Sequence, residues 1–139
     1  MKIEEQVLSI EQMKHLQELD VDMSDASMCW LKYTRTDGVV RYLINVNDIS
    51  CHVMPFMEVF PTYSIGDLIE KLPKSTDFGD LLIEFCNSDL GYGDWDCNEL
   101  YDIEAPQNFK NKPLKNALYD LLCWIAKNHK EVLNKNNQD

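Results

Sequence analysis

Acidic and aromatic residues alternate between positions 89 and 101, and this stretch holds the side chains best suited to binding chemistry. The set consists of Asp89, Tyr92, Asp94, Trp95, Asp96, Glu99 and Tyr101. A loop keeps large aromatic side chains when they pack back on the core or when they contact a partner. Either Trp95 folds under the loop and anchors it, or the aromatics and carboxylates form a surface for a basic protein. We expect the second arrangement and take these seven residues as the partner-binding set.

The order of oxygen-bearing residues around position 94 resembles the start of a calcium-binding loop. Asp94, Asp96 and Asn98 supply oxygen ligands at alternate positions. Such a loop also needs a glycine at its sixth position, where this chain has Glu99, and a glutamate at its twelfth, where it has Ala105. The two glycines of this stretch fit neither of the phosphate-binding glycine patterns. We therefore expect no metal site and no cofactor.

Five cysteines and three histidines are the other groups with reactive chemistry. A thiol nucleophile needs a histidine within hydrogen-bond reach, oriented by a third group. Cys51 and His52 are adjacent, so in a strand they would point to opposite faces, whereas a pair such as His15 and Cys29 depends on the fold. The alternative function is thus a small hydrolase with a Cys–His pair or a carboxylate pair. Widely spaced cysteines are typical of reduced, packed thiols, so we expect no catalytic residue and favour a protein that is not an enzyme.

Charge is unevenly distributed along the chain, whose 24 acidic and 13 basic side chains give a net charge of −11. Residues 75–109 contain nine acids and neither Lys nor Arg, whereas residues 110–139 have a net charge of +3. A field of this sign repels phosphates and anionic lipids, so we expect no direct binding to nucleic acid or to a membrane. The complementary partner is a basic protein, engaged by residues 77–104. A nucleic-acid-binding protein is one example, because clustered carboxylates can imitate a phosphate backbone.

Length and hydrophobic patterning indicate one globular domain. The 139 residues fit a single domain of ordinary size, and we expect residues 134–139 to form a frayed tail. No apolar run reaches the length of about 18 residues that a membrane-spanning helix needs. The first residues are polar and acidic instead of forming a signal peptide. We therefore expect a cytoplasmic protein.

Local signals predict three elements in the first half of the chain. Ser9 and Gln12 fit a capping box, which begins a helix of about 10 residues that ends near Asp20. The dipeptide at positions 37 and 38, Asp-Gly, lies between two strand-like runs over residues 28–35 and 39–46, and such a dipeptide predicts a hairpin. A third apolar run, residues 53–60, contains a proline at position 55, which makes it an edge strand at best or confines the strand to the residues after the proline.

The second half alternates strands and helices. Ser64, with Asp67 three residues later, begins a short helix that Pro73 closes. Strands are expected over residues 81–86 and 99–104, with a loop over 87–98 between them, so that residues 80–105 form one hairpin with a long turn. A longer amphipathic helix begins near position 113, where proline suits the first turn, and the basic residues near its end, His129 among them, suit its dipole. The fold class is α+β: an antiparallel sheet of about four to five strands built from hairpins, with two short helices and the longer C-terminal amphipathic helix packed on it.

Three segments of the chain are similar to segments of a known family. The first segment runs from residues 7–13 through Met28-Cys29-Trp30. The second contains Pro61-Thr62-Tyr63-Ser64, Asp67 and Leu72-Pro73-Lys74. The third contains Ala117-Leu118-Tyr119 and Leu122-Cys123-Trp124. Together they resemble a family of small uncharacterised proteins encoded in Bacteroidales genomes, often within phages and mobile elements. The resemblance spans most of the chain and consists of helix caps and apolar faces. It implies a bacterial origin and a role linked to mobile elements, and it assigns no catalytic residue.

Overall fold

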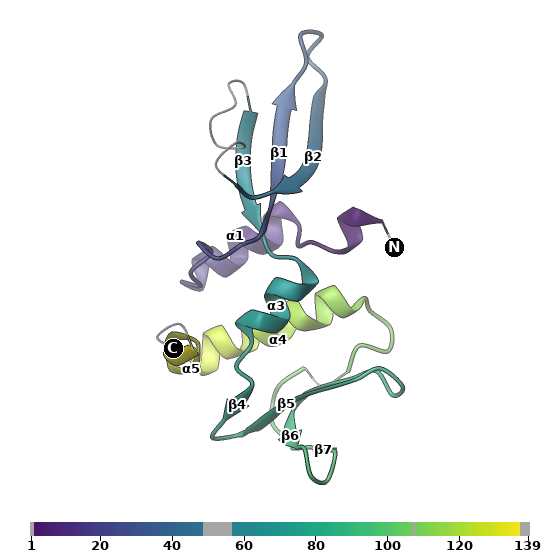
Figure 1. Cartoon of the computed structure of the whole chain (residues 1–139), viewed down its shortest axis with the longest axis vertical. Helices are drawn as coiled ribbons and strands as arrows, with labels where there is room; N and C mark the ends of the chain where they lie inside the picture. Colours follow the sequence, from purple (N-terminus) through teal and green to yellow (C-terminus); the bar gives the residue numbers. More distant parts are fainter. Residues whose placement is uncertain (1, 49–56, 107, 137–139) are drawn as a thin grey trace. The chain divides into compact units, whose positions relative to one another are not determined.

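The fold combines helices with antiparallel sheets, which confirms the predicted α+β class. The structure is a computed structural model that describes residues 2–48, 57–106 and 108–136, with side-chain surroundings described as far as Leu133. The chain divides into two compact units, residues 1–67 and 68–139, and each contains a sheet of its own (Figure 1). The strands therefore form two sheets where one sheet was expected. That the chain acts as a single domain stays a prediction.

Helices of the first unit precede its sheet. A single turn of 3-10 helix, η1 (Ile3–Glu5), is followed by helix α1 (Ile10–Glu18). The predicted capping box is confirmed, because the Gln12 N–H donates to Ser9 Oγ at 3.1 Å and the Ser9 N–H donates to Gln12 Oε1 at 3.0 Å. The helix ends just before Asp20, which adopts a left-handed conformation with φ of 62°.

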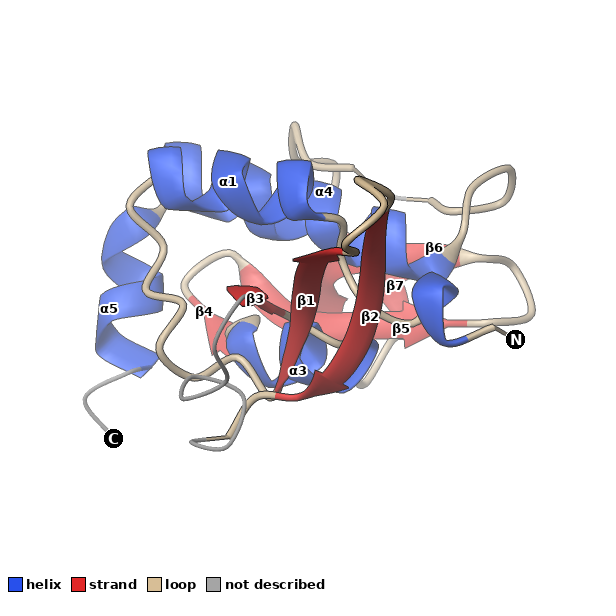
Figure 2. Ribbon diagram, turned by 90° about the horizontal axis from the view of Figure 1, so that it is seen from above, coloured by secondary structure: helices blue, strands red, loops and turns tan. Residues whose placement is uncertain are grey.

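Three antiparallel strands form the first sheet, in the order β2-β1-β3. They are β1 (Met28–Thr34), β2 (Val40–Val46) and β3 (Met57–Thr62). Figure 2 shows β1 and β2 side by side, and their register confirms the predicted hairpin. Its turn is closed by the Asp37 carboxylate, which accepts the Val39 N–H at 3.0 Å, and by Gly38, whose φ is 87°. The sequence therefore specifies this hairpin locally.

Strand β3 lies at one edge of the first sheet, as predicted for the apolar run with a proline at position 55. That proline, like the other residues from 49 to 56, is outside the described residues. On one face of the sheet, Cys29 and Leu31 of β1 are buried, and Met57 and Val59 of β3 pack against them. The alternation of buried and partly exposed residues along β1 follows from this packing.

Leu8 connects the N-terminal segment to two strands and to the chain before α3 (Ile65–Lys71). Its N–H donates to Tyr63 O at 2.9 Å. Its carbonyl accepts from Thr62 Oγ1 at 2.7 Å and from Trp30 Nε1 at 2.8 Å. Since Leu8 is fully buried, these bonds satisfy polar groups that would otherwise be costly to bury. The first unit is thereby closed by contacts between distant parts of the sequence.

Asp67 fixes the start of α3 and its attachment to β1. The Ser64 hydroxyl accepts the Asp67 N–H at 3.1 Å, and Asp67 Oδ2 accepts the Ser64 N–H at 3.0 Å, which confirms the predicted cap. The same carboxylate oxygen accepts the N–H of Ser27 at 3.0 Å and its hydroxyl at 2.6 Å. Asp67 Oδ2 thus accepts three hydrogen bonds, two from Ser27 and one from Ser64.

We predict that Asp67→Asn lowers the free energy of unfolding by about 1.5 kcal/mol, because hydrogen bonds to a charged acceptor are worth more than those to an amide. Urea unfolding followed by circular dichroism measures the loss. Glu70→Gln is the matched control, since Glu70 is an exposed carboxylate of the same helix. Equal losses in the two variants would contradict the assigned role of Asp67.

The second unit is built around a four-stranded antiparallel sheet in which every strand pairs with its neighbour in sequence. Its strands are β4 (Ser75–Thr76), β5 (Gly79–Glu84), β6 (Asp89–Asp94) and β7 (Glu99–Leu100). The strand predicted over residues 81–86 corresponds to β5. The predicted strand over residues 99–104 is reduced to the two residues of β7.

The prediction of a loop over residues 87–98 is wrong, because β6 occupies its centre. Residues 80–105 consequently form two successive tight hairpins instead of one hairpin with a long turn. Gly93 explains how the second hairpin closes. A Cβ atom at this position would lie 2.0 Å from Glu99 O, so only glycine lets β7 approach β6 this closely.

Two helices complete the second unit: α4 (Leu114–Asn128), which follows Pro113, and α5 (Lys130–Asn136). The predicted C-terminal amphipathic helix is confirmed as α4, which contacts β6. Its buried residues are Ala117, Leu118, Leu121, Leu122, Cys123, Ile125 and Ala126. Residues 134–136 belong to α5 and the last three residues lie outside the described ranges, so that residues 134–139 form a frayed tail stays a prediction. No helix within the described ranges is both long and apolar enough to cross a membrane.

Candidate partner-binding surface

A hollow of about 220 Å³ opens on the second sheet. We call it the acidic hollow; its lining residues are Leu82, Glu84, Asp89, Asn98, Glu99 and Leu100. Three carboxylates and two leucine side chains therefore border the same space. Glu84 of β5 stands directly opposite Asp89 of β6, and Leu82 stands opposite Gly91, which has no side chain to fill the space above it.

Strand alternation explains why Leu82, Glu84 and Asp89 share a face, which also includes Leu100 opposite Gly93, whereas Glu99 pairs with Asp94 and borders the hollow from the end of the sheet. Side chains two positions apart in a strand point to the same side of the sheet, so Leu82 and Glu84 lie together. Leu81 of β5 and the buried Leu90 and Tyr92 of β6 form the opposite, buried face. Alternation thus places Glu84 and Asp89 on one face beside the buried Leu82, and Leu81, Leu90 and Tyr92 on the other.

The carboxylates of the acidic hollow have no internal basic counterpart. Like charges opposite each other in a sheet repel, and Glu84 and Asp89 occupy such positions. Asn87 Nδ2 donates to Glu84 Oε1 at 2.8 Å, which offsets part of this cost. Within the described part of the chain, no Lys or Arg forms an ion pair with either residue or with Glu99. The hollow therefore presents uncompensated negative charge.

The turn between β6 and β7 presents Trp95 to solvent. Asp94 Oδ1 accepts the Asp96 N–H at 2.8 Å, and Asn98 adopts a left-handed conformation with φ of 50°. These two features hold the turn. Trp95 at its tip is 61% exposed, so its indole does not fold under the segment as an anchor. Tyr101, just beyond β7, is 43% exposed.

Tyr92 does not belong to the exposed set, which corrects the prediction that it contacts a partner. It is 1% exposed, its hydroxyl donates to Pro73 O at 2.9 Å, and its ring lies 4.9 Å from that of Phe78. Burial raises the pKa of its hydroxyl above the ordinary value. The residue stabilises the core of the second unit, because strand alternation directs its side chain away from the acidic face.

The other predicted residues fall into two groups. Asp89 and Glu99 line the acidic hollow, whereas Trp95 and Asp96 lie in the neighbouring turn and Asp94 supports it. Glu84, Leu82 and Leu100 were not among the predicted residues. Residues 80–84 show no alternation of polar and apolar types that would have indicated the first two, and only the register of β5 against β6 shows that they share the face of Asp89.

Three of the four described thiols, those of Cys29, Cys97 and Cys123, give no support to a nucleophilic site, and the fourth, Cys86, is exposed. Cys29 and Cys123 are buried, and burial raises the pKa of Cys123. Cys97 is exposed, but the negative charge of Asp94 and a hydrogen bond to it raise the pKa of this thiol. A protonated thiol is a poor nucleophile. The adjacent pair at positions 51 and 52 lies outside the described residues.

Two described histidines take part in local contacts. His15 Nδ1 lies 3.6 Å from the Glu18 carboxylate within α1. His129 follows α4, where it was expected as a cation near the helix end, and its ring lies 4.4 Å from that of Phe78 and 4.8 Å from that of Trp124. Across the described ranges, no three His, Cys, Asp or Glu side chains are grouped as a metal ion would require.

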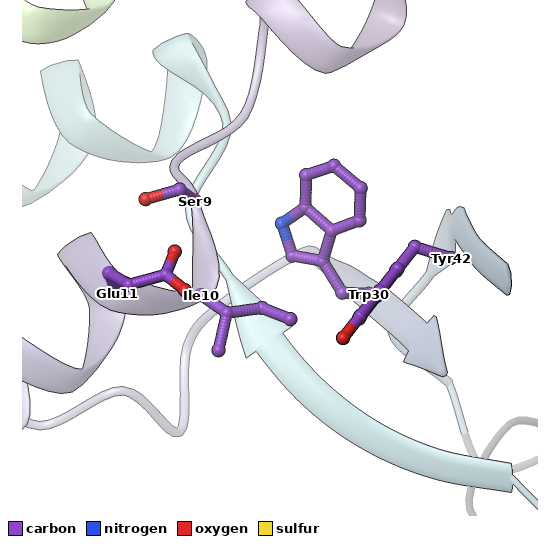
Figure 3. Close-up of a pocket in the computed structure, with 5 residues that line it drawn as sticks. All are labelled: Ser9, Ile10, Glu11, Trp30 and Tyr42. Atoms are coloured by element: carbon purple, nitrogen blue, oxygen red, sulfur yellow. The ribbon is translucent and has the colours of Figure 1, made fainter. Parts of the chain in front are cut away.

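A second hollow, of about 360 Å³, lies in the first unit beside the start of α1 (Figure 3). It is lined by Ser9, Ile10, Glu11, Trp30 and Tyr42. Two of its polar groups are already used, because the indole N–H of Trp30 donates to Leu8 O and Ser9 is engaged with Gln12. The rest of the lining consists of the aromatic and aliphatic surface of Trp30, Tyr42 and Ile10, the Tyr42 hydroxyl and the Glu11 carboxylate.

Comparison with known proteins does not identify this chain. No protein-family model, curated protein or solved structure shows significant similarity to it. The resemblance to the Bacteroidales family therefore stays a prediction, and the function has to be argued from the surfaces described above.

Proposed function

We propose that this protein is a non-catalytic binding module that engages a basic protein partner through the acidic hollow and the exposed side chains of Trp95, Asp96 and Tyr101. The observation that carries the proposal is the combination of three carboxylates and two leucines around one hollow, with no ion pair to a Lys or Arg among the described residues. Charge of this kind is costly to keep together in an isolated protein, and a cationic partner would remove the cost.

A lysine or arginine side chain of the partner fits the chemistry of the hollow. Its aliphatic stem would pack chiefly on the partly exposed Leu100, since Leu82 is only 5% exposed, while its charged head would donate hydrogen bonds to the carboxylates. Arginine has an advantage over lysine, because its planar guanidinium can bind two carboxylate oxygens and can also stack on an exposed indole such as that of Trp95.

The surrounding charge would speed association as well as orient it. The segment from 77 to 104 carries nine acids without a base, and such a field attracts a basic partner over about the Debye length, roughly 10 Å at 0.1 M salt. Binding should therefore weaken as salt increases. The proposed natural partner is a basic protein, for instance one that binds nucleic acid, in a bacterial or mobile-element setting.

We predict that Glu84→Gln combined with Glu99→Gln weakens binding of a hexa-arginine peptide about tenfold, which corresponds to about 1.4 kcal/mol. Chemical-shift titration of the labelled protein measures the affinity and locates the peptide. Hexa-lysine should bind more weakly than hexa-arginine, and hexa-glutamine should not bind.

The control removes the same amount of charge elsewhere in the segment, by Asp102→Asn combined with Glu104→Gln. Both residues are exposed and lie outside the acidic hollow. If the control weakens peptide binding as much as the hollow variant does, only total charge matters and the proposed site is wrong. Capture from a bacterial lysate at low and moderate salt, with the hollow variant as reference, then identifies the natural partner.

A further inference from the structure

Strand β2 forms the outer edge of the first sheet, and its side chains are apolar on both faces. Pairing in the described sheet stops at β2 on this side, since the order is β2-β1-β3. The exposed apolar residues of the strand are Val40, Tyr42, Leu43 and Val46, each between 43% and 54% exposed. Proline and lysine, which commonly protect exposed edges, are absent from its seven residues. An edge of this kind is a template for another strand.

Alternation of the hydrogen bonds shows which residues of β2 face outward. The Arg35 N–H donates to Val39 O at 2.7 Å, and the Asn47 N–H donates to Ser27 O at 2.9 Å. These bonds mark the hydrogen-bonded pairs at the two ends of the β1–β2 ladder. Such pairs alternate along an antiparallel ladder, so the odd-numbered residues of β2 bond to β1. Of the even-numbered residues between them, Val40, Tyr42 and Ile44 direct their N–H and C=O groups away from β1. The groups of Val46 are already engaged, because its N–H donates to Asn45 Oδ1 and its C=O accepts from the Asp48 N–H.

The sequence of β2 is complementary to itself in one antiparallel register. Pairing centred on Leu43 places Tyr42 of one copy opposite Ile44 of the other, twice, and both are outward-facing residues. Leu43 then meets Leu43 in a non-hydrogen-bonded pair, where side chains are closest. Arg41, the one charged residue of the strand, stands opposite Asn45 and not opposite a second arginine.

We propose that two copies of this chain associate through β2 in this register, which joins their first sheets into one continuous six-stranded antiparallel sheet. The occupant of the edge is a second copy, because the register pairs apolar residues with apolar residues and opposes no like charges. Tyr42 also borders the hollow beside the start of α1 that Figure 3 shows, so the paired strand would extend the apolar surface around this hollow.

The dimer should be weak and should strengthen with salt. A seven-residue strand pair provides less contact than the roughly 800 Å² per partner of a standard stable interface, so the dissociation constant should be about 100 µM. Each copy carries a net charge of −11, and screening this repulsion favours association. The dependence is opposite in sign to that of binding to a basic partner, so failure of this proposal is distinguishable from failure of the proposed function.

Sedimentation equilibrium of the full chain between about 10 µM and about 1 mM, at about 50 mM and about 500 mM NaCl, measures the dimer. Leu43→Lys and Leu43→Glu should each remain monomeric, because like charges meet at the centre of the register. An equimolar mixture of the two variants should associate again. Ile3→Lys, at an exposed apolar position outside the strand, is the matched control and should dimerise like the wild type.

Circular dichroism of each variant confirms folding before its mass is measured. A wild-type chain that stays monomeric at about 1 mM would overturn the proposal. So would a mixture of folded Leu43→Lys and Leu43→Glu that does not associate, since the register requires these two side chains to meet. Association that weakens as salt increases would point to a charge-driven contact between other surfaces and would equally reject pairing through β2.

Discussion

Replacing Leu121 by alanine should lower the free energy of unfolding by about 3 kcal/mol. Leu121 lies in α4 and is fully buried, as are its neighbours Leu118, Leu122 and Ile125. The substitution removes apolar contacts and leaves a cavity that closely packed neighbours fill only partly. Since many domains are stable by only about 5–15 kcal/mol, this is the largest effect that we expect from a single side-chain truncation in the second unit.

Urea unfolding followed by circular dichroism and by tryptophan fluorescence measures the effect of Leu121→Ala. Lys127→Ala is the matched control, because Lys127 is exposed on the same helix, and it should change the free energy by less than about 0.5 kcal/mol. A loss below about 1 kcal/mol for Leu121→Ala would show that α4 is not packed as described.

Alkaline pH should destabilise the protein steeply above pH 10, because two tyrosines cannot ionise while they remain buried. Tyr63 and Tyr92 are 0% and 1% exposed. Burial raises the pKa of both, and at Tyr63 the hydrogen bond to Asp25 adds to the effect. The folded state therefore keeps both hydroxyls protonated at a pH at which they ionise in the unfolded chain.

The sign of the effect follows from proton binding. Below pH 10 both tyrosines are protonated in both states, so their contribution to stability is fully present. Above pH 10 the unfolded chain loses these protons and the folded chain does not, so stability falls by about 1.4 kcal/mol per pH unit for each tyrosine. The loss continues until the pH reaches the raised pKa of the folded state.

Urea unfolding between about pH 9 and pH 11.5 measures this slope, and absorbance at about 295 nm reports tyrosine ionisation. Tyr92→Phe should make the decrease of the unfolding free energy with pH less steep by the contribution of one tyrosine. Tyr42→Phe, which removes a half-exposed tyrosine, is the matched control. Ionisation of all six tyrosines near pH 10 in the folded protein would contradict the burial of Tyr63 and Tyr92.

Elements that depend on local hydrogen bonds could be predicted from the sequence. The cap at Ser9, the turn at Asp37 and Gly38, and the cap formed by Ser64 and Asp67 each involve residues within three positions of one another. In such cases the side chain supplies the partner for a nearby backbone group, so the residue types alone indicate the structure. The pattern of α4 is local in the same sense.

Strand β6 could not be predicted, because its apolar residues are separated by glycines, which are uncommon in strands. Gly91 and Gly93 indicate a turn when they are considered alone. In the fold, Gly93 allows β7 to approach, and Leu90 and Tyr92, on either side of Gly91, are buried. Tertiary packing thus overrides the local preference, and it reverses the expectation for Tyr92.

The candidate site was predictable in its charge but not in its geometry. Absence of basic residues over 75–109 is visible in the sequence, and it pointed to Asp89 and Glu99. The contribution of Glu84 depends on its being opposite Asp89 in the sheet. Register between strands is set by turn length and packing together, so residue types along one strand could not show which carboxylates would share a hollow.

The contacts of Leu8 have a consequence for the order in which the chain folds during synthesis. Its hydrogen bond with Thr62 spans 54 positions, so the first unit cannot close until the ribosome has released residues beyond Tyr63. Loop closure over such a distance carries an entropic cost before any contact repays it. Each hairpin of the second sheet, by contrast, joins neighbours in sequence. That sheet can therefore form strand by strand as each segment emerges, with a contact order much lower than that of the first unit.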